Sequence, residues 1–238
     1  MNKREVAYRL RDEMDAKFYR DLDSFVLFGS VASGQETQTS DLDLYAISEN
    51  WELKKFAIGL LSRYDFPISF VTETPEEFRR YLSIGDPFSI SLIYTGIELL
   101  KRPTTFLDAQ KEFSHDKRFR SRSFHEYLKR ESVENLSQVC QPLENFLNRA
   151  YNAAAVALHY ALVKDKKSVS ADEINSFSGK QAMLLALRRA GLADLEHTYR
   201  EFIELYYSAR KRGEKTTIGE LERISHLSRD IVENAIGD

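Results

Sequence analysis

The apolar positions of the first 115 residues switch between two periodicities. Between Val6 and Leu22 they recur every four residues, which predicts an amphipathic helix over residues 3–22 that packs on a sheet. Shorter apolar runs bounded by turn-forming residues predict strands at residues 24–28, 41–47, 67–72 and 94–100. Helical spacing over residues 51–63 and a capping box at residues 74–77 complete the predicted order of helix, strand, strand, helix, strand, helix.

From about residue 122 onward the pattern is helical. Apolar residues at spacings of three and four fill residues 143–164 and 195–212, with no strand-like alternation between them. The predicted helix starts are capping boxes at residues 170–173, 178–181 and 217–220, with Asp194 as a further N-cap, and Gly191 and Gly213 are predicted stops. We therefore expect an α+β chain with one domain at residues 1–115 and an all-α helical bundle at residues 122–238.

Composition and charge exclude several classes of protein. The 34 Lys and Arg against 37 Asp and Glu leave a net charge of −3, which argues against a dedicated duplex-DNA binder. The single cysteine, Cys140, rules out an intrachain disulfide or a Cys-rich zinc site. The charged N-terminus and the lack of a long apolar run predict a cytoplasmic protein with no membrane partner.

One motif carries recognisable chemistry. Gly29 and Ser30 end a predicted strand, and a glycine there lets backbone N–H groups approach a phosphate closely. After ten further residues come Asp41 and Asp43, whose spacing of two directs both carboxylates to one face of a strand, as an Mg²⁺ site requires. The plain alternative is a common turn followed by a solvated strand edge, but the full spacing arises by chance in only about one such chain in several hundred.

The segment FGSVASGQETQTSDLDLYAI, residues 28–47, resembles the signature of the polymerase-β-type nucleotidyltransferase superfamily, especially its minimal prokaryotic members. The resemblance covers about residues 20–101 and implies a small mixed sheet with helices on one face. It also implies transfer of a nucleoside monophosphate from a nucleoside triphosphate, expected to be ATP, to a hydroxyl. In that case Gly29 and Ser30 hold the distal phosphates with Ser40 nearby, and Asp41 and Asp43 bind Mg²⁺.

The chain departs from this family at one position. A third carboxylate usually stands on the next strand, in a stretch similar to Val-Asp-Leu-Val-Thr, and Ser69 takes its place here. Serine cannot bridge metal ions or accept a proton at neutral pH as a carboxylate does. Asp65 and Glu73 have the right strand parity but lie about 13 Å from Ser69 along a strand, too far to replace the acid. Another residue therefore substitutes, or catalysis has been lost.

Two segments of the helical half, residues 148–154 and 202–210, resemble helices of the HEPN domain, although plain bundle packing explains such patterns equally well. Six residues separate Arg118 from His125 and four separate Arg120 from it, a spacing found in ribonucleases of that family that we interpret as coincidence. Residues 115–130 carry a local charge of +4, which a solvated linker explains and which would also attract triphosphate or RNA. Formation of a homodimer through the helical domain is a further open alternative.

The leading hypothesis is an Mg²⁺-dependent nucleotidyltransferase that modifies a hydroxyl of a protein or a small molecule. Because Ser69 cannot act as the base, we expect the base in the helical domain and choose Glu144, although a helix dipole alone favours an acid there. The first alternative is a catalytically degenerate nucleotide-binding or toxin–antitoxin-type interaction module. The second is an aminoglycoside-type nucleotidyltransferase, which a fused helical bundle of this size also resembles.

Overall fold

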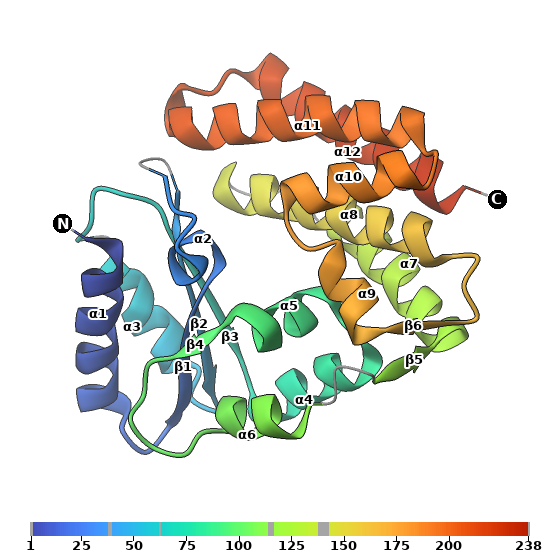
Figure 1. Ribbon diagram of the computed structural model, residues 1–238. Coiled ribbons are helices and arrows are strands. Elements are labelled where there is room, and N and C mark those ends of the chain that lie inside the picture. Colours follow the sequence, from blue (N-terminus) through green and yellow to red (C-terminus); the bar gives the residue numbers. More distant parts are fainter. Residues whose placement is uncertain (1, 38–39, 62, 114–116, 138–142, 238) are drawn as a thin grey trace. The chain divides into compact units, whose positions relative to one another are not determined.

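The computed structural model divides the chain into two compact units (Figure 1). The N-terminal unit comprises Met1–Ser83 and Phe88–Ser114, and the helical unit comprises Ile84–Pro87 and His115–Asp238. The structure describes the whole chain except residues 1, 38–39, 62, 114–116, 138–142 and 238.

A four-stranded mixed sheet forms the centre of the N-terminal unit. Its strands are β1 (Leu22–Phe28), β2 (Leu42–Ser48), β3 (Ile68–Glu73) and β4 (Ile97–Glu98), in the order β3-β2-β1-β4. β1 runs antiparallel to β2 and β4, and β2 runs parallel to β3. This mixed sheet, followed by a helical C-terminal region, confirms the predicted α+β fold class.

Six helices accompany the sheet: α1 (Lys3–Phe18), α2 (Gly29–Ser33), α3 (Glu52–Leu61), α4 (Pro75–Ile84), α5 (Pro87–Thr95) and α6 (Thr105–Glu112). The strand predicted at residues 94–100 is wrong in extent, because α5 runs to Thr95 and only Ile97–Glu98 pair with β1. Periodicity does not distinguish a short buried helix from a strand, and Pro87 favours the first position of a helix. The first helix also ends before the predicted residue 22, which belongs to β1, and α2 replaces the start of an expected loop.

Helices contact both faces of the sheet, whereas the family resemblance implied one. Apolar residues of α1 and α3 form one core with the face of the sheet that contains Phe25 and Leu44. On the opposite face, Tyr45 contacts Phe78 of α4 and Phe88 of α5, with ring centroids 6.0 and 5.8 Å apart. The second layer of helices therefore covers part of the face to which the odd-numbered residues of β2 point.

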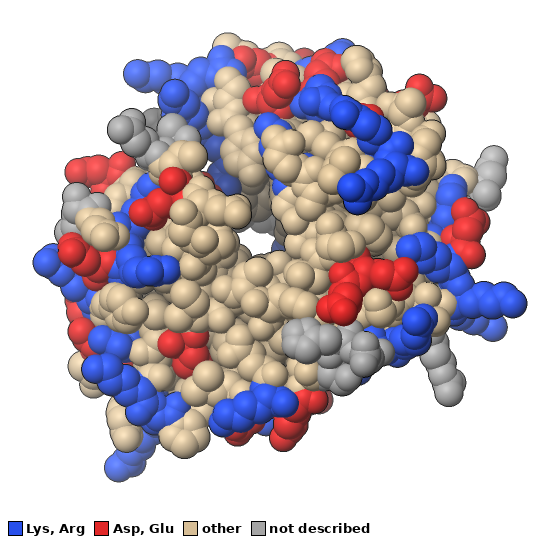
Figure 2. Space-filling model, in the orientation of Figure 1, with Lys and Arg blue, Asp and Glu red and all other residues tan. Residues whose placement is uncertain are grey.

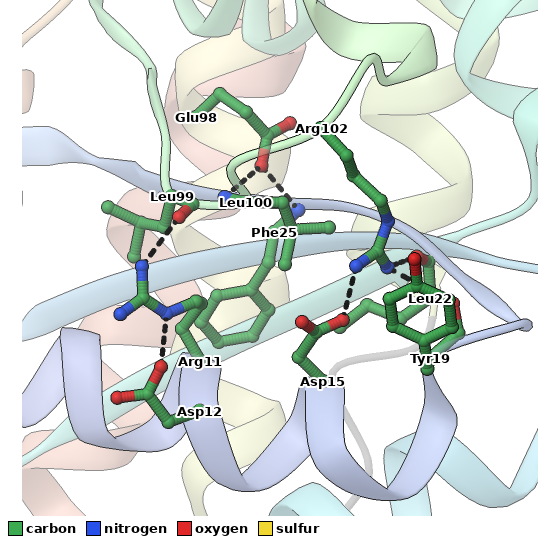
Figure 3. A network of polar contacts seen from close by, with 10 residues as sticks. All are labelled: Arg11, Asp12, Asp15, Tyr19, Leu22, Phe25, Glu98, Leu99, Leu100 and Arg102. Carbon is green, nitrogen blue, oxygen red and sulfur yellow. Dashed lines mark hydrogen bonds and ion pairs between the residues drawn. The ribbon is translucent and has the colours of Figure 1, made fainter.

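Two arginines tie α1 to the sheet and to the segment after β4 (Figure 3). The guanidinium of Arg11 donates to the carbonyl oxygen of Leu99 at 2.8 Å. That of Arg102 donates to the carbonyl oxygen of Leu22 at 2.6 Å and pairs with the Asp15 carboxylate of α1. These hydrogen bonds give partners to the backbone carbonyl of Leu22, at the start of β1, and to that of Leu99, directly after β4.

The partly buried Glu98 holds the short strand β4 beside β1 (Figure 3). One carboxylate oxygen accepts hydrogen bonds from the backbone N–H groups of Phe25 and Leu100, and the other accepts one from the hydroxyl of Thr104. Burial raises the pKa of Glu98, and these hydrogen bonds oppose that rise. The Glu98 carboxylate thus supplies hydrogen bonds that a longer strand would make through its backbone. This explains how a strand of only two residues is held beside β1.

The helical unit contains, within its described residues, six α-helices and a two-stranded ribbon. The elements are β5 (Arg118–Arg120), α7 (Ser121–Ser137), α8 (Leu143–Val163), β6 (Ser168–Ser170), α9 (Ala171–Ser176), α10 (Lys180–Arg189), α11 (Ala193–Arg212) and α12 (Ile218–Ile236). Buried side chains of α8, α10, α11 and α12 form its core. The ribbon was not predicted, because its three-residue strands are too short to show alternation.

The predicted helix starts are confirmed in part. Capping boxes form at Ser170 and Thr217, where each hydroxyl accepts from the backbone N–H three residues later. The box expected at residues 178–181 does not form, since α10 begins after Gly179 without a side-chain cap. Asp194 lies inside the first turn of α11 and is not its N-cap, which is Leu192. Among the described residues, no helix has both the length and the apolar content to cross a bilayer.

Candidate nucleotide-binding site

The backbone turns sharply where β1 ends and α2 begins. Gly29, the first residue of α2, has a φ of +71°, a conformation that side chains with a Cβ rarely adopt. The missing side chain also leaves room for a carboxylate. A Cβ at Gly29 would collide with Oδ2 of Asp43 and would lie 3.1 Å from its Cγ. The glycine and the second aspartate of the motif are therefore in direct contact.

The loop after Gly29 is held by its own backbone and by α1. Gly34 ends α2 in the left-handed conformation, and the N–H of Gln35 donates to the carbonyl oxygen of Ser30 at 2.9 Å. The Arg4 guanidinium donates to the carbonyl oxygens of Val31 and Ala32 at 3.3 and 3.1 Å. Sequence reasoning missed Arg4, because nothing distinguishes it from other charged residues on the helix.

Ser40 stabilises the end of this loop. Its hydroxyl accepts a hydrogen bond from the backbone N–H of Thr37 at 2.8 Å, and its own N–H donates to the carbonyl oxygen of Thr37 at 3.2 Å. Asp41 follows directly and precedes the first residue of β2. Two hydrogen bonds therefore join Ser40 to Thr37 just before Asp41, and contact of Ser40 with a nucleotide stays a prediction.

Three register positions line up across the sheet beside this turn. Asp43 of β2 pairs with Phe28 of β1 on one side and with Ser69 of β3 on the other. Register partners on adjacent strands point to the same face, so the half-buried Ser69 lies beside the Asp43 carboxylate. Ser69 thus occupies the strand position at which the resembling family carries its third acid.

Neither nearby acid replaces the missing one. Glu73 is on the same face of β3 as Ser69, but it is aligned with Ile47, and its carboxylate accepts the hydroxyl of Tyr45 at 2.5 Å. Asp65 is exposed and precedes β3. Both observations agree with the prediction that these residues lie too far from Ser69 to take the place of the third acid.

Binding of Mg²⁺ by Asp41 and Asp43 stays a prediction. Within the described residues, no group of three or more His, Cys, Asp or Glu side chains is arranged to hold a metal ion. Mg²⁺ is commonly bound by one or two carboxylates, with water and substrate phosphates as its other ligands. The absence of a side chain at Gly29 lets the Asp43 carboxylate lie against the turn between β1 and α2.

The remaining predicted groups lie in the helical unit. Glu144 falls in the first turn of α8, and its side chain is outside the described part of the structure, as are Cys140 and His115. His125 contacts the carbonyl oxygen of Val163 at 2.9 Å and the ring edge of Tyr160, which is a packing role within the bundle. The role of Glu144 therefore stays a prediction.

The basic run after residue 116 is structured, and the expectation of a linker is wrong. Its residues form β5 and most of α7. Arg122 pairs with Glu126 at 3.0 Å, and Arg130 lies 3.6 Å from Glu131, while Lys129 covers the ring of Tyr160. Lys and Arg side chains are intermixed with Asp and Glu on the face of the molecule drawn in Figure 2. Acids thus compensate part of the positive charge of the run.

Comparison with known protein families agrees with the geometry of the N-terminal unit. Residues 7–93 match the nucleotidyltransferase domain family. The matched domain contains the turn at Gly29, both aspartates and Ser69, and it supports nucleotidyl transfer as the general chemistry of this unit. The match ends before α7 to α12, the helices whose likeness to HEPN domains stays a prediction. No curated protein matches the chain.

Replacing Gly29 with alanine is expected to weaken Mg²⁺-dependent nucleotide binding about tenfold, equivalent to about 1.4 kcal/mol. The new Cβ would strike the Asp43 carboxylate and displace it from the metal site. The matched control is Gly34→Ala, because Gly34 has the same positive φ but no atom within 4 Å of a Cβ. Titration with a fluorescent nucleotide measures both variants. Equal affinities for the two variants would contradict the assignment.

Proposed function

We propose that this protein is an Mg²⁺-dependent nucleotidyltransferase that moves a nucleoside monophosphate from a nucleoside triphosphate, expected to be ATP, to a hydroxyl of a protein or a small molecule. The observation that supports it most is the contact between Gly29 and the Asp43 carboxylate, inside the segment that matches the nucleotidyltransferase domain. This chemistry requires a phosphate-binding turn beside a metal-binding carboxylate, and the contact supports the assignment of these roles to Gly29 and Asp43.

Each residue of the motif has a defined role in the proposal. The backbone at Gly29 and Ser30 binds the distal phosphates, and Ser40 shapes the loop that borders them. Asp41 and Asp43 hold Mg²⁺, which neutralises charge on the phosphates when it is bound. Asp43 is well placed for this, because it lies between the Gly29 turn and Ser69 on neighbouring strands.

Attack by the acceptor hydroxyl requires a group that takes up its proton. A hydroxyl that attacks phosphorus loses its proton, and Ser69 cannot take it at neutral pH. We assign the role of proton acceptor to Glu144. The helical unit that contains Glu144 is also proposed to present the acceptor. Ser69 itself supports a second candidate function, a module that binds nucleotide without turning it over.

A single experiment separates the two functions. The full chain is titrated with each of the four common ribonucleoside triphosphates with and without Mg²⁺, and pyrophosphate release is then measured with candidate protein and aminoglycoside acceptors. Mg²⁺-dependent binding with pyrophosphate release supports the transferase. Binding without release, together with release by Ser69→Asp, supports the silent module. Absence of Mg²⁺-dependent binding to any triphosphate would overturn both.

A further inference from the structure

The hydroxyl of Ser69 is unengaged on the face of the sheet that carries Asp43. Within the described residues it makes no hydrogen bond, and its residue is only half-buried. Two buried serines of this unit have hydroxyls with a structural role: that of Ser24 accepts from the N–H of Phe106, and that of Ser48 accepts from the N–H of Asn50. The hydroxyl at position 69 is therefore accessible for chemistry.

Strand order places Ser69 opposite the phosphate-binding turn. Gly29 follows the last residue of β1, Asp43 lies on β2, and Ser69 lies on β3, so the aspartate stands between the other two. Neighbouring strands are about 4.8 Å apart, which separates the strands of Gly29 and Ser69 by about 10 Å. An in-line displacement needs this arrangement, with the leaving group and the attacking oxygen on opposite sides of the phosphorus.

The substitution at position 69 changes what this place in the site can supply. A carboxylate there could accept a proton from an incoming hydroxyl, whereas serine brings a hydroxyl of its own. The nearest acid farther along the strand, Glu73, already accepts the hydroxyl of Tyr45. The position is thus suited to donate an oxygen nucleophile and unsuited to act as a base.

We propose that Ser69 is a nucleotidyl acceptor within the chain, modified by its own site when no external acceptor is bound. This inference rests on the proposed transferase function. The Ser69 oxygen attacks the α-phosphorus of the bound nucleoside triphosphate, and the new oxygen–phosphorus bond forms as the bond to the β-phosphate oxygen breaks. Pyrophosphate leaves, and the hydroxyl proton passes to water. The product is a serine-linked nucleoside monophosphate, which blocks the acceptor position and makes the reaction self-limiting.

Mass spectrometry of the intact full chain tests the proposal. The chain is incubated with Mg²⁺ and each of the four ribonucleoside triphosphates in turn, and modified peptides are then mapped. We expect a single nucleotidyl group on the peptide that contains Ser69, none in Ser69→Ala, and a retained adduct at position 69 in Ser69→Thr. The matched control is Ser83→Ala on α4, an exposed serine, which is expected to be modified to the same extent as the parent.

A second measurement separates failure of this inference from failure of the proposed function. Binding of Mg²⁺ with the non-transferable α,β-methylene analogue of ATP is measured by its effect on the unfolding temperature, with no turnover required. If the analogue binds but no triphosphate modifies Ser69, or if the adduct persists in Ser69→Ala, the inference is overturned and the nucleotide site stands. If neither the analogue nor any of the four triphosphates binds, the proposed function fails and the inference with it.

Discussion

The double variant Asp41→Asn, Asp43→Asn is expected to lose nucleotidyl transfer by about 1,000-fold and to lose Mg²⁺-dependent nucleotide binding. Asparagine keeps the size of aspartate, so the contact with Gly29 is preserved, but the two negative charges that hold the cation are gone. Metal-based charge stabilisation supplies several kcal/mol in such reactions, and each 1.36 kcal/mol corresponds to a tenfold change in rate.

The same variant is expected to fold normally. Two carboxylates two residues apart at the start of β2 repel each other in the absence of a cation, so their removal leaves the free energy of unfolding unchanged or slightly raised. Asp65→Asn is the matched control, since this acid is exposed and lies outside the sheet. Isothermal titration with ATP and Mg²⁺ measures binding. An unchanged dissociation constant in the double variant would place the metal site elsewhere.

The second large effect concerns His159, which is buried in α8 with 7% of its surface exposed. Its Nδ1 lies 2.8 Å from the carbonyl oxygen of Ala155 and must carry the proton, because a carbonyl can only accept. Its Nε2 is buried without a hydrogen-bond partner among the described residues, and the ring packs edge-on against Phe177. A second proton would therefore place an unpaired positive charge in an apolar core.

Burial lowers the pKa of His159 from 6.5 to about 4. Between these values the unfolded chain binds the proton and the folded chain does not, so the free energy of unfolding falls as the pH is lowered from above 6.5 to about 4. The expected loss is about 3 kcal/mol, at 1.36 kcal/mol for each pKa unit. Above pH 7 the group is neutral in both states, and it contributes no pH dependence.

Replacing His159 with leucine is expected to remove this part of the pH dependence. Urea unfolding of the parent and of His159→Leu, followed by circular dichroism at several pH values, gives the difference between their free energies of unfolding. That difference should move in favour of the variant by about 3 kcal/mol between pH 7 and pH 4. His226→Leu, at an exposed position of α12, should leave the slope unchanged. A difference that is independent of pH would contradict the assignment.

Much of the fold was predictable because its signals are local. The first three strands lie within two residues of their predicted bounds, since each is a short apolar run between turn residues. The capping boxes at Ser170 and Thr217 are likewise formed by residues three apart. Where local signals were ambiguous, as between strand and helix at residues 87–95, packing of the helix on the sheet decided.

For the candidate site, the sequence alone determined the chemistry available: a glycine and a serine after a strand, two aspartates on the next, and a serine in place of a third acid. Tertiary structure alone decided which of these groups meet. The contact of Gly29 with Asp43, the pairing of Asp43 with Ser69 and the loop contacts of Arg4 join residues distant along the chain. Which strands pair, and which side chains meet across them, depend on how the whole sheet and its helices pack, because these contacts join residues far apart in the sequence.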